Sequence, residues 1–461
     1  MLKSQGKYLF NLIASKGLKF DIIYDFTANC QLDNPAQRLF FTSLNKNRNM
    51  EEGAVLQAND KTELKYPNLF DKCDAFTTAD EIKAAGIYPY FHPMQSAPGE
   101  EVMIDGHWCI MVGSNNYLGL VNHPEVKRAA AEAAEKFGSG CTGSRFLNGT
   151  LDLHLELEAR LAKFMKKEAA QVFSTGFQTN LGTISSLVGK SDAIIIDRQV
   201  HACIVDGCRL SYGKVYKFAH NDMDDFRRVI TQVRQLVRGG ILVVVDGVFS
   251  MEGDIINLPE LVKIAKEFDA RILVDDAHGV GVMGETGAGT AEHFGLGDQV
   301  DMTMGTFSKS FASLGGFVAG SKSVINFIKH HARSLIFSAS IPPSNAAAVI
   351  KALDILEAEP ERRENLWKHA RRMKQEFQNL GFNTGHSATP IVPIVVGEDL
   401  DAFAFWKDLF DNGVFTNPVI SPAVPPGQAM IRTSYTANHT DEQLDRVLEV
   451  IAKVGKARGI I

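Results

Sequence analysis

The stretch that decides the fold is Met304-Gly305-Thr306-Phe307-Ser308-Lys309-Ser310-Phe311-Ala312-Ser313-Leu314-Gly315-Gly316-Phe317, where one lysine stands among hydroxyl-bearing and small residues. It joins the expected strands Asp301–Thr306 and Gly316–Ala319. Burying an unpaired ammonium is costly, so Lys309 at this place invites a chemical explanation. An amine with a lowered pKa can form a Schiff base with an aldehyde cofactor. A lysine on a surface loop is the alternative, and the stretch alone does not decide between the two.

Strands and helices alternate around this stretch. The expected strands are short, continuously apolar and rich in valine and isoleucine, which is typical of a parallel sheet covered on both faces. They are Ala170–Phe173, Ala193–Ile196, Val215–Phe218, Ile241–Val245, Arg271–Val274, Met302–Thr306 and Gly316–Ala319. This order predicts an open α/β sheet that binds ligands at the carboxyl ends of its strands.

The residues before and after these segments predict how the chain divides into domains. Residues 1–100 are polar and weakly patterned, and we expect them to form an N-terminal extension and arm. A large α/β domain is expected over 101–343, beginning with a hairpin around the Asp105-Gly106 turn. Long helices followed by shorter strands and helices predict a smaller C-terminal α+β domain over 344–461.

The net charge, the cysteine spacing and the length of the apolar runs limit the kinds of protein that this chain can be. A formal net charge of -6 gives no electrostatic footprint for nucleic acid. The 6 cysteines show no metal-binding or paired spacing, which favours reduced thiols, no metal site and a cytoplasmic location. No apolar run is long enough to span a bilayer. Tyr8–Ile13 predicts an amphipathic helix packed on the body of the protein, with peripheral membrane contact as the minority alternative.

Charged side chains follow two neighbouring strands. Asp275 directly follows the segment Arg271–Val274, His278 lies just beyond it, and Lys309 follows the next strand. A carboxylate and a lysine at adjacent strand ends can meet over one ligand. A helix cap for Asp275 and a structural role for His278 are the alternatives. The glycine-rich segment Phe137–Arg145 favours a connecting loop, with backbone near an anion as the alternative.

Eight segments, taken in order from about Tyr88 onward, carry a resemblance. They are Asn116–Leu120, Thr142–Arg145, Ser174–Phe177, Asp197–His201, Gly247–Asp254, Val274–His278, Gly305–Lys309, and Arg432 with Ala437–Thr440. Together they resemble the α-oxoamine synthase family of pyridoxal-phosphate enzymes, which has the fold-type-I aminotransferase architecture. The resemblance implies a mainly parallel central sheet with helices on both faces and pyridoxal 5'-phosphate as cofactor. It favours the chemical explanation for Lys309.

The resemblance also implies roles around the cofactor ring. Lys309 would hold the cofactor covalently and move protons at the substrate's α-carbon. Asp275 would pair with the pyridine nitrogen, so that the ring acts as an electron sink. His201 would stack on the ring face, His278 would bond to its phenolic oxygen, and Ser250 would lie near it.

Further roles follow for the phosphate and the substrate. The phosphate would be held by the backbone amides of Gly176 and Phe177 and by the hydroxyls of Thr306 and Ser308. Ser338 and Ser340 match the segment that reaches a neighbouring subunit's phosphate, which implies a homodimer with shared active sites. Arg432 would clamp the amino-acid carboxylate, and Asn116 would lie in the substrate-side loop.

The implied reaction is a decarboxylative condensation of an amino acid with an acyl thioester to give a 3-oxo amine. Thr306–Ser310, followed by Gly315-Gly316-Phe317, is more similar to the serine palmitoyltransferase branch than to the glycine-using and biotin-pathway branches. We therefore expect L-serine and a long-chain acyl donor, acyl-CoA or acyl carrier protein, in the first step of sphingolipid-type synthesis. Glycine C-acetyltransferase or 8-amino-7-oxononanoate synthase is the alternative activity. A non-catalytic partner subunit is the minor alternative.

Overall fold

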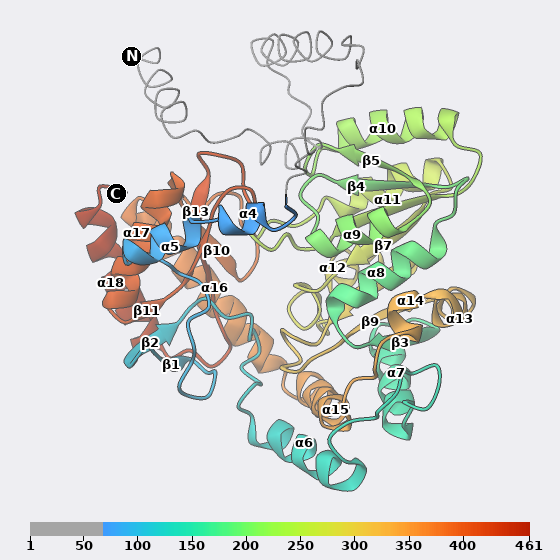
Figure 1. The fold of residues 1–461 in the computed structure, drawn as a ribbon, viewed down its shortest axis with the longest axis horizontal. Coiled ribbons are helices and arrows are strands. Elements are labelled where there is room, and N and C mark those ends of the chain that lie inside the picture. Colours follow the sequence, from blue (N-terminus) through green and yellow to red (C-terminus); the bar gives the residue numbers. More distant parts are fainter. Residues whose placement is uncertain (1–67) are drawn as a thin grey trace, which may run out of the picture. The chain divides into compact units, whose positions relative to one another are not determined.

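The computed structural model describes residues 68–461 (Figure 1). The described residues up to Phe76 contain the short helix α4 (Asp71–Asp74), and Thr77–Ile461 forms one compact unit. The helix expected at Tyr8–Ile13 and most of the expected extension over residues 1–100 lie outside the described residues. Between residues 68 and 461, no helix has the length and apolar character needed to cross a membrane.

A seven-stranded sheet with the order β3-β9-β8-β7-β6-β4-β5 is the largest sheet of the compact unit and lies on the right in Figure 1. Its strands are β3 (Ala169–Phe173), β4 (Ala193–Asp197), β5 (Lys214–Phe218), β6 (Ile241–Asp246), β7 (Arg271–Asp275), β8 (Met302–Thr306) and β9 (Gly316–Gly320). Only β9 runs against its neighbours, β3 and β8. The expected mainly parallel α/β sheet is confirmed.

Helices cover both faces of this sheet. Apolar side chains of one face pack against α8 (Gly176–Leu187), α9 (Ala202–Leu210), α13 (Lys322–His331) and α14 (Arg333–Ile336). The opposite face packs against α7 (Asp152–Phe164), α10 (Met223–Leu236), α11 (Leu258–Glu267) and α15 (Pro343–Ala358), and α6 (Pro124–Phe137) lies against α15. The short α12 (Thr290–His293) follows β7. This burial on both faces explains why the strands are continuously apolar.

Three carboxylates at strand ends do not all lie on the same face of the sheet, because successive side chains of a strand point to opposite faces. Asp246 and Asp275 are paired across β6 and β7, so they lie on the same face, which is the α8–α9 face to which Leu273 belongs. Asp197 follows Ile195 on the α10–α11 face. The carboxylates at these neighbouring strand ends therefore lie on opposite faces of the sheet, with Asp197 on one face and Asp246 and Asp275 on the other.

Two further sheets have three strands each, and their hydrogen-bonded neighbours follow the orders β1-β2-β11 and β10-β13-β12. The predicted hairpin is confirmed, with Asp105 and Gly106 both at positive φ, as a type I′ turn requires. The strands are β1 (Glu101–Ile104), β2 (His107–Met111), β10 (Ile391–Gly397), β11 (Val414–Phe415), β12 (Asn417–Val419) and β13 (Ala429–Ser434). Because β2 pairs with β11, the start of the expected large domain shares a sheet with the C-terminal part. The three domain bounds stay a prediction.

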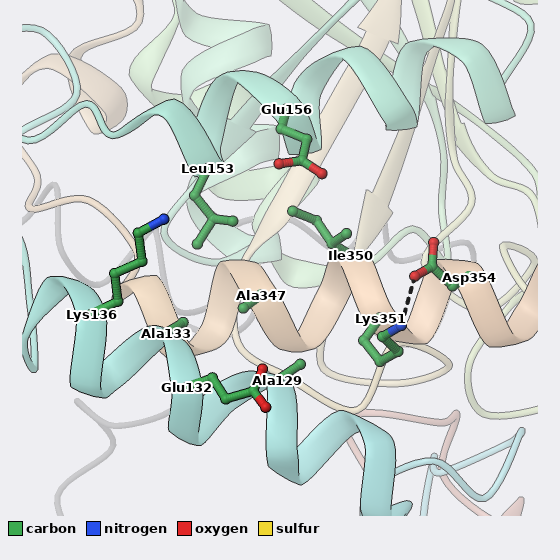
Figure 2. A pocket seen from close by; sticks show the side chains of 10 residues that line it. All are labelled: Ala129, Glu132, Ala133, Lys136, Leu153, Glu156, Ala347, Ile350, Lys351 and Asp354. Atoms are coloured by element: carbon green, nitrogen blue, oxygen red, sulfur yellow. Dashed lines mark ion pairs between the residues drawn. The ribbon is translucent and has the colours of Figure 1, made fainter.

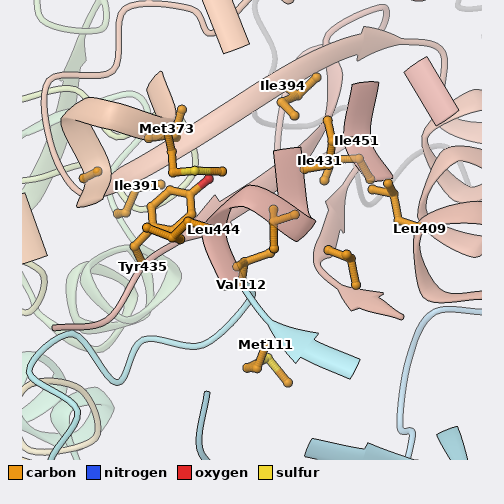
Figure 3. Close-up of a cluster of buried hydrophobic side chains, with 14 of the residues drawn as sticks. Met111, Val112, Met373, Ile391, Ile394, Leu409, Ile431, Tyr435, Leu444 and Ile451 are labelled. Atoms are coloured by element: carbon orange, nitrogen blue, oxygen red, sulfur yellow. The ribbon is translucent and has the colours of Figure 1, made fainter. Parts of the chain in front are cut away.

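The C-terminal core joins these strands to three long helices. Buried side chains of β2, β10 and β13 pack against α16 (Pro360–Leu380), α17 (Asp399–Asp411) and α18 (Asp441–Ala457), as Figure 3 shows for Ile391, Leu409 and Ile451. The helix α5 (Thr78–Ala84) precedes the hairpin. This core fixes β13, which carries Arg432.

The cation of the glycine-rich segment forms a buried ion pair. Arg145 donates to Glu158 from Nη1 (2.7 Å) and Nη2 (3.1 Å), and Glu158 also accepts from the side chain of Gln171 (2.6 Å). We expect Arg145→Ala to lower the free energy of unfolding by about 3–5 kcal/mol, because it leaves a buried carboxylate without its cation. Urea unfolding measures this. Arg128→Ala, which removes an exposed pair with Glu125, should change it by only about 0–1 kcal/mol. Equal losses in the two variants would contradict the assignment.

Candidate active site

The loop between β8 and β9 positions Lys309. Phe307 and Phe311 are fully buried on either side of the lysine and anchor the loop in the core. The loop closes on itself through a hydrogen bond from the Phe307 amide to the Gly315 carbonyl (2.9 Å). Gly315 has a φ of 132°, where a side chain is strained, so glycine is needed to close it. The loop thus holds Lys309 at the carboxyl end of β8.

The amine of Lys309 lies among charged groups at this sheet edge. Its burial lowers the pKa of Lys309 to about 8, against the opposing effect of the Asp275 carboxylate, while the positive charge of Arg432 lowers it further. A lysine in this environment has an appreciable neutral fraction near neutral pH and can act as a nucleophile or base. This is the environment that the chemical explanation requires, and it differs from that of a solvated surface lysine.

The carboxylate of Asp275 is oriented by two hydrogen bonds. Its Oδ2 accepts from Nδ2 of Asn180 (2.6 Å), and its Oδ1 accepts from the Ala277 amide (3.0 Å). Asn180 is buried in α8, the helix that covers this face of the sheet. Asn180 was not among the site residues predicted from the sequence. An asparagine in the apolar middle of a helix, opposite a strand-end carboxylate, is the signal that could have found it.

The two predicted histidines lie in different environments. His201 is the N-cap of α9: its Nδ1 accepts from the Cys203 amide (3.2 Å), which assigns the ring proton to Nε2. His201 is exposed. His278 is buried, and its Nδ1 pairs with the hydroxyl of Tyr117 (2.7 Å). Burial, with the charges of Lys309 and Arg432, holds the pKa of His278 well below its usual range, so its ring is neutral.

Arg432 reaches the same place from β13. Its Nε donates to the backbone carbonyl of Ser250 (2.6 Å), and its Nη2 donates to Oδ1 of Asn115 (3.0 Å). Asn116, the residue that the sequence analysis selected, accepts instead from the Val121 amide (3.3 Å). Ser250 contacts Arg432 through its backbone. Asn115 and Tyr117 were missed as individual residues, although both lie in the amide-rich loop that the sequence analysis identified.

The start of α8 fits a phosphate group. Thr175 caps the helix by accepting from the Gln178 amide (3.0 Å), and the amides of Gly176 and Phe177 lie in the first turn, where helices have no internal partner. A Cβ added at Gly176 would come within 2.7 Å of Oγ1 of Thr306, so only glycine leaves this cradle open. The hydroxyls of Thr306 and Ser308 are 3.0 Å apart. Amides, hydroxyls and a helix N-terminus suit a dianion, and with Lys309 and Asp275 they fit pyridoxal phosphate.

Ser338 and Ser340 lie on a segment beside this cradle. Oγ of Ser338 accepts from Nε2 of Gln178 (3.1 Å), and Oγ of Ser340 donates to the Gly149 carbonyl (2.6 Å). Phe337 is 78% exposed and Leu147 is 76% exposed. Large apolar side chains thus face outward on the loops next to the two serines.

A separate surface pocket of about 310 Å³ lies between α6, α7 and α15 (Figure 2). Ala133, Leu153 and Ile350 are among its lining residues, with Lys351 and Asp354 forming an ion pair at its side. Its lining contains none of the predicted site residues.

The lowered pKa of Lys309 predicts a pH dependence. Only the neutral amine attacks an aldehyde, so capture of pyridoxal phosphate by the cofactor-free protein should accelerate as pH rises and level off above about 8. An exposed alkylamine, whose pKa is about 10.4, should keep accelerating over the same range. Absorbance measured after rapid mixing, at constant ionic strength, follows both reactions. A rate for the protein that still rises steeply at about pH 10 would contradict the lowered pKa.

Comparisons with known proteins show the family and the fold of the chain. The family model described as aminotransferase class I and II matches residues 109–451. A serine palmitoyltransferase of Sphingobacterium spiritivorum is 53% identical over 388 residues, covering 84% of this chain and 97% of the relative. An 8-amino-7-oxononanoate synthase of Thermoanaerobacter pseudethanolicus is 44% identical over 382 residues, covering 83% and 96%. The solved serine palmitoyltransferase of Sphingomonas wittichii superposes with a TM-score of 0.83 at 38% identity, covering 86% of this chain and 100% of its own. A solved SPT with a PLP internal aldimine gives the same TM-score of 0.83 at 37% identity, with the same coverage of 86% and 100%.

Proposed function

The chain belongs to the class I and II aminotransferase family, and from this membership we propose that it is a pyridoxal-phosphate-dependent acyltransferase of the α-oxoamine synthase type. In the proposed reaction, L-serine condenses with a long-chain acyl thioester. The thiol and carbon dioxide leave, and a 3-oxo amine of the 3-ketodihydrosphingosine type results. The serine palmitoyltransferases at 46% and 53% identity support this choice of substrates. The observation that carries the proposal is the Lys309 amine, with a lowered pKa, between the charges of Asp275 and Arg432.

When bound, pyridoxal phosphate supplies an electron sink for the α-carbon of the amino acid. We assign the pyridine nitrogen to Asp275, whose carboxylate is already oriented by Asn180. His278 is assigned to the phenolic oxygen through Nε2, because Tyr117 occupies Nδ1. The amides of Gly176 and Phe177 and the hydroxyls of Thr306 and Ser308 are assigned to the phosphate. The exposed ring of His201 is assigned to the face of the cofactor ring.

The remaining assignments concern the substrate. Lys309 takes the proton from the α-carbon, which its neutral fraction near pH 8 allows. Arg432 binds the amino-acid carboxylate, for which its planar guanidinium is suited. Its Nε is held by Ser250 and its Nη2 by Asn115, so the guanidinium is fixed before substrate arrives. A clamp that is already ordered loses little conformational entropy when it binds.

The proposed assembly is a homodimer with shared active sites. The exposed side chains of Phe146, Leu147 and Phe337 support it, because large apolar groups gathered on neighbouring loops favour a protein interface. In this arrangement Ser338 and Ser340 reach the partner's phosphate site. The proposed location is the cytoplasm, supported by the free cysteines among residues 68–461.

The alternative activity is that of an 8-amino-7-oxononanoate synthase or a glycine C-acetyltransferase. Relatives with the first name, at 44% identity, keep this alternative open. A non-catalytic partner subunit is disfavoured, because the chain has the lysine at position 309 together with Asp275 and Arg432.

Product analysis tests the proposed reaction. Protein loaded with cofactor is incubated with carboxyl-labelled serine and palmitoyl-CoA, and the gas and lipid products are analysed by mass spectrometry. We expect the label in carbon dioxide and an unlabelled long-chain 3-oxo amine. Turnover only with glycine and acetyl-CoA, or only with alanine, would move the function to the alternative.

A further inference from the structure

His220 bridges two carboxylates on the face of the sheet opposite Lys309. Its Nδ1 lies 3.0 Å from Oδ1 of Asp197, and its Nε2 lies 3.1 Å from Oδ2 of Asp254. Ionised carboxylates only accept, so both ring nitrogens donate when the imidazole is protonated. Burial opposes the charge, but the hydrogen bonds and charges of the two aspartates raise the pKa of His220 to about 10. The imidazole of His220 is therefore cationic at neutral pH.

The two aspartates depend on His220 to different degrees. Asp197 is fully buried and also accepts from the amides of Gln199 (2.7 Å) and Asn221 (2.7 Å), so the sheet side of the bridge is fixed. Asp254 lies in the loop after β6, and its Oδ1 is buried without a partner in the described part of the chain. Its Oδ2 has His220 as the shorter of two side-chain contacts, the other being Asn221 at 3.4 Å. His220 is thus the principal hydrogen-bond partner of the Asp254 side chain.

The loop that carries Asp254 contacts Arg432 through Ser250. Across its base, the Phe249 amide donates to the Asp254 carbonyl (3.0 Å), and the ring of Phe249 stands edge-on to His220 at 4.5 Å. Ser250 is the next residue, and its carbonyl accepts from Nε of Arg432 (2.6 Å). Gly253 returns the chain with a φ of 70°, where a Cβ would lie 2.4 Å from the Ile391 carbonyl. The loop is therefore a short, compact link between His220 and the guanidinium.

We propose that His220 is a positioning residue for the amino-acid substrate: by bridging Asp197 and Asp254 it helps to fix residues 247–255, and through the Ser250 carbonyl it contributes to the orientation of Arg432. The same loop is also held at the Gly253 carbonyl, which accepts from the Ala388 amide (2.9 Å) and from Oγ1 of Thr389 (2.9 Å). The inference rests on the proposed function, in which Arg432 binds the substrate carboxylate. His220 itself touches neither substrate nor cofactor. Its effect is on amino-acid affinity, with the cofactor environment left unchanged.

A double-mutant cycle tests this inference on cofactor-loaded protein. In His220→Gln we expect the half-saturating serine concentration to rise about tenfold, because a charged hydrogen-bonded bridge is lost, while the visible spectrum without serine stays the same. In an Arg432→Lys background, His220→Gln should not raise the half-saturating serine concentration further, since both substitutions act through the same side chain at position 432. Asp254→Asn weakens the bridge from the loop side while keeping the histidine, and should shift the serine dependence in the same direction if His220→Gln does not fold.

Asp192→Asn is the matched control. Asp192 accepts from the amides of Gly189 (2.8 Å) and Gly240 (2.8 Å) at the opposite ends of the same strands, so its loss should lower the melting temperature without changing the serine dependence. Fold-changes of His220→Gln and Arg432→Lys that multiply would overturn the inference, as would an unchanged serine dependence in both bridge variants. If the unsubstituted protein responds to glycine instead, the same cycle is run with glycine. No response to any amino acid would overturn the proposed function, and this inference with it.

Discussion

Replacing Lys309 by alanine should lower kcat/KM for the condensation by roughly a thousandfold or more, because one amine both holds the cofactor and moves the substrate proton. The melting temperature should change much less, since the anchors of the loop are the buried rings of Phe307 and Phe311. Turnover of serine and palmitoyl-CoA measures the loss, and the visible cofactor band should disappear with it.

Lys329→Ala is the control for this substitution, because Lys329 is an exposed lysine of the neighbouring helix α13. It should retain both the band and the activity. A Lys309→Ala protein that kept more than about a tenth of the activity would contradict the assignment of Lys309.

Replacing Asp275 by asparagine should lower kcat/KM by roughly a hundredfold to ten-thousandfold, because a neutral amide no longer stabilises a proton on the pyridine nitrogen. The substitution keeps the shape of the side chain, so cofactor content should remain near that of the unsubstituted protein. Steady-state turnover and absorbance after gel filtration measure the two quantities.

The neighbouring carboxylate provides the matched control. Asp246 is paired with Asp275 across the two strands and lies on the same face of the sheet. Burial, with the charge of Asp275, holds the pKa of Asp246 well above its usual range, so Asp246→Asn removes little charge. We expect less than about a tenfold loss in that variant. Equal losses in the two variants would show that position within the sheet, and not the pairing with the cofactor, decides the effect.

Local patterns predicted the parts of the fold that depend on short-range chemistry. The apolar strands, the Asp105-Gly106 turn and the strand-end carboxylate Asp275 followed from residue type and spacing. The reversed direction of β9 has a physical reason of the same kind: only the residues between Thr306 and Gly316 connect it to β8, and a parallel crossover needs a dozen or more. The pairing of β2 with β11 joins residues far apart in the sequence, and no local pattern encodes it.

The candidate site was predicted at the level of segments more than of individual contacts. In the structure the charges of Lys309 and Arg432 act on His278, and that of Asp275 acts on Lys309, while the roles of these residues toward a cofactor stay a prediction. Asn115, which contacts Arg432, was not singled out beside Asn116, because two adjacent amides in one loop differ only in the direction in which the backbone points them. The substrate-side role of Asn116 stays a prediction. Asn180 and His220 were missed because each acts through a partner on another element.

The proposed reaction is tested most directly by a visible-absorbance titration of purified, cofactor-loaded protein with serine, glycine and alanine, followed by palmitoyl-CoA. We expect a saturable spectral change with serine, and then a long-chain 3-oxo amine and carbon dioxide when the thioester is added. A protein without visible absorbance, or one whose spectrum responds to none of the three amino acids, would contradict the proposed reaction.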